Sequence, residues 1–115
     1  MEKIQYLDMN DRLIRRFHEA IGDLFLVYMN DRLFDKAIKK IDKLQFDILD
    51  GVTAAECSAE HKIITFDCIG MLTDDMEEIK DTILHELCHI LAPKSHHGKE
   101  WKKYARHFGV KISSK

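Results

Sequence analysis

The chain has 115 residues, of which 45% are hydrophobic and 33% are charged, with one proline and five glycines. This composition is typical of a globular protein without long disordered linkers, and the length suits one modest core, so we expect a single domain over residues 1–115. The formal net charge of −2 excludes a protein that binds nucleic acid through its bulk charge alone.

The cysteines give no sign of structural crosslinks. Cys57, Cys68 and Cys88 are odd in number and form no C-x-x-C pair, so we expect neither a disulfide framework nor a C-terminal zinc ribbon. The N-terminus has no apolar run typical of a signal peptide, and the longest apolar run, residues 24–29, is too short to span a bilayer. We therefore expect a cytoplasmic protein with no membrane partner.

Two helices are predicted in the first third of the chain. Residues 10–29 carry apolar side chains at i, i+3, i+4 and i+7, which predicts a long amphipathic helix. Residues 33–41 repeat this spacing and predict a second helix. The pentapeptide MNDRL precedes both segments, and we interpret it as a helix-start signal with Asn10 and Asn30 as N-caps.

The middle of the chain is predicted to form a sheet. Residues 44–49 alternate apolar and polar side chains and end at the turn signal Asp50-Gly51. Residues 53–58 form a weaker candidate strand, and residues 62–67 are rich in the β-branched and aromatic residues that strands prefer. The pattern predicts a small antiparallel sheet of three strands.

Two further helices are predicted after the sheet. The first begins near Thr73, where an acidic turn suits the positive end of the helix dipole. It ends near Leu91, because Pro93 cannot continue a helix. The last helix presents Trp101, Tyr104, Ala105 and Phe108 on one face, with Gly109 as its predicted C-cap. The expected fold class is therefore α+β.

The helix before Pro93 contains the pattern H-E-x-x-H at residues 85–89. His85 and His89 lie four residues apart, so both imidazoles can point at one tetrahedral Zn²⁺. Glu86 is placed to accept a proton from a water molecule that the metal activates. His97, in the loop that follows, is a candidate third ligand. Three protein ligands with one open position are typical of a catalytic zinc site.

The motif has simpler interpretations than a metal site. H-E-x-x-H can occur by chance in a chain with seven histidines, and the two histidines could be ordinary surface residues. However, His85 and His89 fall together on the side of the helix opposite its apolar stripe, so they are not core histidines. The stripe comprises Met76, Ile79, Ile83, Leu84, Leu87, Ile90 and Leu91.

With these residues in view, the sequence resembles the SprT-like (Spartan-type) zinc metalloprotease domain. The resemblance rests on HELCH at residues 85–89 and on HGKEW at residues 97–101, which matches a family pattern H-G-x-x-[FW], and extends from about Arg16 to Gly109. It implies a zincin-like fold with N-terminal helices, a three-stranded sheet, an active-site helix and a C-terminal helix. A metzincin is excluded, because Ala92 and Ser95 occupy the positions where that pattern requires Gly and His.

The resemblance also implies roles for individual residues. His85, His89 and His97 would be the metal ligands, Glu86 the general base and Zn²⁺ the cofactor. His96 has no position in the family pattern. It could support the ligands, act as an alternative ligand or be a polar loop residue, and we favour the last interpretation. The function implied is hydrolysis of peptide bonds in a protein or peptide substrate by a metal-activated water.

Two alternatives and one further partner remain open. The zinc site could instead shape a non-catalytic surface that binds a protein or nucleic acid, or the protein could be a regulatory peptidase devoted to one partner. Nucleic acid is a possible partner through the C-terminal segment, although a solvated basic helix face is the simpler interpretation. Against the single acidic residue Glu100, this segment carries seven basic residues: Lys94, Lys99, Lys102, Lys103, Arg106, Lys111 and Lys115.

Overall fold

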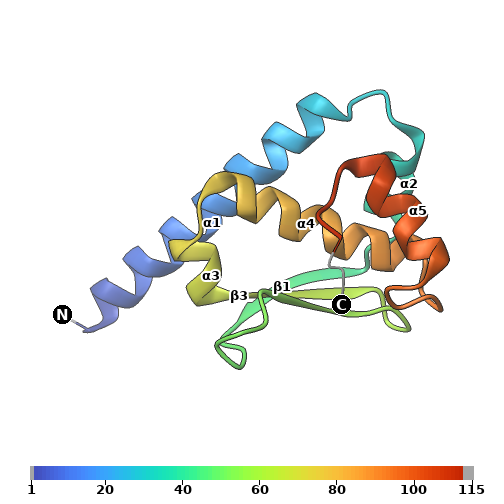
Figure 1. The fold of residues 1–115 in the computed structure, drawn as a ribbon. Helices are drawn as coiled ribbons and strands as arrows, with labels where there is room; N and C mark the ends of the chain where they lie inside the picture. Colours follow the sequence, from blue (N-terminus) through green and yellow to red (C-terminus); the bar gives the residue numbers. More distant parts are fainter. Residues whose placement is uncertain (1, 113–115) are drawn as a thin grey trace.

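A computed structural model describes residues 2–112, with side chains from residue 11 onward. This part of the chain is α+β, as predicted, with five helices and one three-stranded sheet (Figure 1). The elements in chain order are α1 (Glu2–Val27), α2 (Arg32–Lys40), β1 (Lys43–Asp47), β2 (Ala55–Ser58), β3 (Ile63–Asp67), α3 (Cys68–Thr73), α4 (Met76–Leu91) and α5 (Lys99–Phe108).

The prediction of an antiparallel sheet is wrong, because the sheet is mixed. Its strand order is β1-β3-β2, and β3 runs parallel to β1 but antiparallel to β2. The connection between β1 and β2 is too long to form a tight hairpin. Asp50 folds it back, since its carboxylate accepts hydrogen bonds from the backbone N–H groups of Val52 and Thr53 at 3.0 and 2.6 Å. β2 therefore lies away from β1, and β3 enters between them.

The helices cover one face of the sheet (Figure 1). α4 lies in the middle of the molecule, packed against α1, α2, α5 and β2. Its predicted apolar stripe is buried, with Met76 half-buried at the start of the helix. From the sheet, Ile64 and Phe66 of β3 complete the core, and each is 1% exposed. Burial of these apolar side chains holds α4 in place independently of any ligand.

The helix boundaries differ from the predictions at three places. α1 begins at Glu2, so Asn10 lies inside a helix and is not an N-cap. Asp31, and not Asn30, caps α2 by accepting hydrogen bonds from Leu33 and Phe34. The short helix α3 was not predicted; Asp67 caps it through the N–H of Gly70. Within residues 2–112, no helix combines the length and apolarity needed to cross a membrane.

Candidate metal centre

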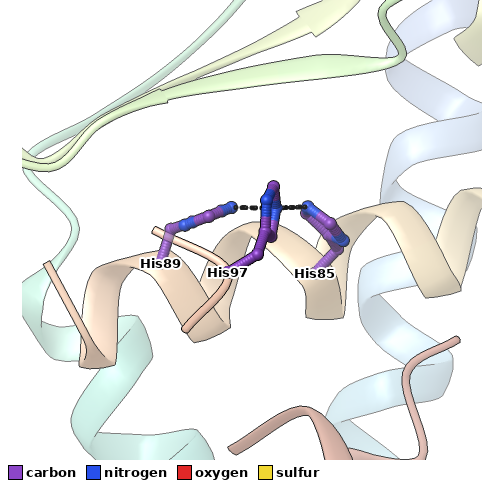
Figure 2. A group of neighbouring side chains, drawn as sticks. All are labelled: His85, His89 and His97. Carbon is purple, nitrogen blue, oxygen red and sulfur yellow. Dashed lines mark hydrogen bonds between the residues drawn. The ribbon is translucent and has the colours of Figure 1, made fainter. Parts of the chain in front are cut away.

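α4 and the loop after it bring three imidazole rings together (Figure 2). His85 and His89 lie one turn apart on α4, and His97 enters from the loop between α4 and α5. The Nε2 atom of His97 lies 3.1 Å from that of His89 and 3.2 Å from that of His85. His85 and His89 are half-buried, whereas His97 is exposed. The three nitrogens therefore face one point that is open to solvent on the side of His97.

A tightly folded loop returns His97 to α4. Ser95 donates its N–H to the carbonyl of Ala92 at 3.2 Å, and Gly98 donates to the carbonyl of Ser95 at 2.7 Å. His96 adopts a left-handed conformation, with φ of 49°, which costs backbone energy for a residue other than glycine. The Ser95 hydroxyl then accepts the N–H of Trp101, at the start of α5, at 3.1 Å. These bonds fix the direction in which His97 points.

The arrangement fits a divalent cation with tetrahedral coordination. Nitrogens about 2.0–2.1 Å from a tetrahedral Zn²⁺ lie about 3.3 Å from one another, close to the spacings observed. Burial, with the nearby His97, lowers the pKa of His85. Burial, together with His85 and His97, lowers the pKa of His89 to about 4. Both rings are therefore neutral at pH 7, the form that coordinates metals. The three histidines could hold a metal ion.

Glu86 lies beside the first histidine, almost fully buried at 4% exposed. Its Oε2 atom is buried and has no hydrogen-bond partner among the described residues, which is costly for a carboxylate. Burial raises the pKa of Glu86 to about 7, and the charge of Glu56 on β2 adds to the rise. A cation held by the histidines would lower this pKa again, since an opposite charge favours the ionised form. The orphaned oxygen is thus a second observation that fits a metal at this site.

The family comparison agrees with this geometry. A model of the SprT-like family matches residues 23–114, which include α4, the loop and α5. The chain belongs to the SprT-like family. No curated protein matches the sequence. The matched range starts seven residues after Arg16 and continues past Gly109, so it differs at both ends from the extent that the motifs indicated.

The sequence places Trp101 in the HGKEW motif and on the apolar face of the last helix, but predicts no contact with the histidines. Trp101 is buried, as that face predicts. However, its ring centroid lies 4.9, 5.7 and 4.8 Å from those of His85, His89 and His97. Its indole N–H also donates to the carbonyl of His85 at 3.4 Å. The HGKEW pattern was the available sequence signal for this contact, because it places the tryptophan four residues after His97.

Other candidate residues lie outside the cluster. Among the described residues, the candidate metal-binding group contains only the three histidines, so His96 is not part of it. Cys88 is fully buried and is not part of this group either. The basic residues from Lys94 to Lys111 are mostly exposed along the loop and α5. Their contact with nucleic acid stays a prediction.

Proposed function

We propose that this SprT-like protein is a zinc-dependent peptidase, a single zincin-like domain that uses His85, His89 and His97 as metal ligands and Glu86 as general base. One arrangement carries the proposal: three Nε2 atoms converge, and Glu86, the residue after His85, has a buried carboxylate oxygen with no hydrogen-bond partner among the described residues. A purely structural zinc site needs a fourth protein ligand. No fourth histidine, cysteine or carboxylate of the described residues joins this cluster.

The residues of the chain divide the catalytic work. Zinc, when bound, would supply a Lewis acid that makes water acidic near neutral pH and polarises the scissile carbonyl. Glu86 accepts the proton of that water at its free carboxylate oxygen and returns it to the leaving amine. Its burial serves this role, because a carboxylate with few competing hydrogen bonds is a stronger base. The buried ring of Trp101 holds the three imidazoles in position.

The sheet offers a way to bind an extended peptide near this site. β2 is an edge strand, and it packs against α4. An edge strand presents unpaired N–H and C=O groups that a peptide backbone can pair with. Glu56 of β2 is close enough to raise the pKa of Glu86. A peptide aligned on β2 would therefore pass near the proposed base.

The test of this function is the variant Glu86→Gln. It keeps the shape of the side chain but removes the proton acceptor, so we expect zinc to stay bound while hydrolysis of a labelled unfolded protein falls by a factor of about 100 or more. Zinc content is measured by elemental analysis of the same sample. Cleavage at the wild-type rate by the substituted protein would show that Glu86 is not the base.

The ligand assignment is tested by a matched pair of variants in the loop. His97→Ala removes one of three nitrogens, and we expect loss of stoichiometric metal. His96→Asn changes the neighbouring histidine to a residue that tolerates its left-handed backbone, and we expect metal binding to remain. Co²⁺ should quench the fluorescence of Trp101, the only tryptophan of the chain, in His96→Asn. The same Co²⁺ concentration should not quench it in His97→Ala. Equal quenching in both would remove His97 from the ligand set.

A further inference from the structure

Within residues 2–112, no strand pairs with the outer edge of β1, the edge that faces away from β2 and β3. Lys43 donates its N–H to the carbonyl of Lys62, at 3.4 Å, so its backbone groups point towards β3. Backbone groups alternate in direction along a strand. Leu44 and Phe46 therefore direct their N–H and C=O groups outward, where β3 cannot pair with them. Such an edge is a template for another strand.

The sequence of this strand, Lys-Leu-Gln-Phe-Asp, is complementary to itself when two copies run antiparallel. With Gln45 on the two-fold axis, Lys43 lies opposite Asp47 of the second copy, and Asp47 lies opposite its Lys43. Both residues are exposed, and neither forms an ion pair with the described residues of its own chain. In the same register, Leu44 and Phe46 exchange the four outward hydrogen bonds of the two copies.

An apolar cavity opens beside this edge. It has a volume of about 350 Å³ and is lined by residues of α1, α2, β1, β3 and α4. Two of its lining residues, Phe25 of α1 and Leu44 of β1, are 46% and 39% exposed. Ile48, directly after β1, is 70% exposed. Apolar side chains gathered around a free strand edge are typical of a surface that another polypeptide covers.

We propose that β1 pairs with β1 of a second copy of this chain, in antiparallel register around Gln45, to form a two-fold dimer with a continuous six-stranded sheet. The strand order is β2-β3-β1-β1-β3-β2. The pairing satisfies the free backbone groups, matches both charges and covers the open cavity with apolar residues of both copies. A second copy is the occupant, because β1 itself carries both charges in the order that an antiparallel partner requires. β2 and the histidine cluster stay accessible in this dimer.

Sedimentation equilibrium of the wild-type protein, together with a charge swap, tests the proposal. The expected mass is about 27 kDa, twice the 13.5 kDa of one chain. Asp47→Lys and Lys43→Asp each place like charges opposite one another twice, so we expect each to weaken dimerisation at least tenfold. The double variant restores opposite charges and should restore the dimer. Lys103→Glu, an exposed charge reversal on α5, is the control and should dimerise normally.

A cysteine variant tests the register. Gln45 would face itself across the two-fold axis at a Cα separation of about 4.5 Å, a distance that a disulfide can bridge. Gln45→Cys should therefore form a crosslinked dimer under mild oxidation. Thr65→Cys, on the neighbouring strand β3, is the control and should not form a crosslinked dimer. Like Gln45→Cys, it removes the hydrogen bond between Gln45 and Thr65. A wild-type monomer at all concentrations, a double variant that stays monomeric, or equal crosslinking of both cysteine variants would each overturn the proposal.

Discussion

At the residue scale, the position of His97 depends on its neighbour Gly98. A Cβ atom at Gly98 would lie 2.8 Å from the carbonyl oxygen of Ser95 and 3.1 Å from its hydroxyl. The first atom belongs to the backbone and cannot move without opening the loop turn. The Gly98 N–H makes the short bond that closes this turn. The absence of a side chain here is therefore a condition for the three imidazoles to meet.

We expect Gly98→Ala to lower zinc affinity by about tenfold or more, since a small displacement of one ligand weakens a metal site. Competition with a chromophoric chelator measures this affinity. Gly22→Ala is the matched control: nothing lies within 4 Å of a Cβ there, and alanine in a helix should raise the unfolding free energy by about 0.5–1 kcal/mol. Unchanged zinc affinity in Gly98→Ala would contradict the account of the loop.

From the sequence, the relative position of His85 and His89 could be predicted. The loop and the tryptophan that surround the three histidines could not. The separation of His85 and His89 by four residues on a helix is enough to bring their rings together. The approach of His97 follows from a helix stop at Pro93, but the turn that aims it depends on Ser95 and Gly98. The contact of Trp101 with all three rings could not be derived from periodicity, which shows a side chain as apolar without saying what it touches.

At the element scale, the side chain of Asp31 contacts both α2 and α5. Asp31 caps α2 and also lies 2.7 Å from the ring Nε2 of His107 on α5. Burial acts to raise the pKa of Asp31, but the N–H of Phe34 and the side chain of His107 outweigh it, and the net effect is a lowered pKa. A carboxyl with a lowered folded-state pKa stabilises the fold at pH values above its unfolded pKa. This contribution is lost as the pH falls through the folded value.

We expect Asp31→Ala to lower the unfolding free energy by about 1–2 kcal/mol at pH 7, because it removes both the cap and the contact with His107. The difference from wild type should shrink as the pH falls below about 4, the usual pKa of an unfolded aspartate, and through the lower pKa of the folded carboxyl. Urea denaturation across this pH range measures it. Asp35→Ala, which removes an exposed pair with Lys39, should cost less than about 0.5 kcal/mol. If the unfolding free energies of Asp31→Ala and wild type differed by the same amount at every pH, the ionised carboxyl of Asp31 would not be the source of the stabilisation.

Elements were easier to predict than their order in the sheet. The three strand segments were predicted within two residues of their observed bounds, since strand patterns are local signals. The antiparallel arrangement failed at β1, which pairs in parallel with β3 and not with β2, its neighbour in the sequence. The observed order depends on the connection around Asp50, which sends β2 to the far side of β3. The periodicity of the strands gives no information about the path of this connection.

At the scale of the whole molecule, α4 serves the core and the site with opposite faces. Ile83 and Leu87 line the apolar cavity that opens beside β1, while His85 and His89 point towards His97. The predicted stripe and the predicted histidine face therefore both follow from the period of one helix. The core is large enough to hold this helix without help from a metal, in contrast to small zinc-dependent folds.

Metal removal should therefore change the site and leave the fold. We expect the protein treated with a chelator to keep its far-ultraviolet circular dichroism at 25 °C. Its melting temperature should fall by a few degrees, since a ligand that binds only the folded state stabilises it by mass action. Loss of helical signal on chelation would mean that zinc, and not the apolar core, organises α4.

The most direct measurement is X-ray absorption spectroscopy of the zinc-loaded protein. It reports the kind, number and distance of the atoms bound to the metal. We predict three imidazole nitrogens and one oxygen from solvent at about 2.0–2.1 Å, with no sulfur. A fourth imidazole, a sulfur ligand at about 2.3 Å, or fewer than three nitrogens would contradict an open site held by His85, His89 and His97.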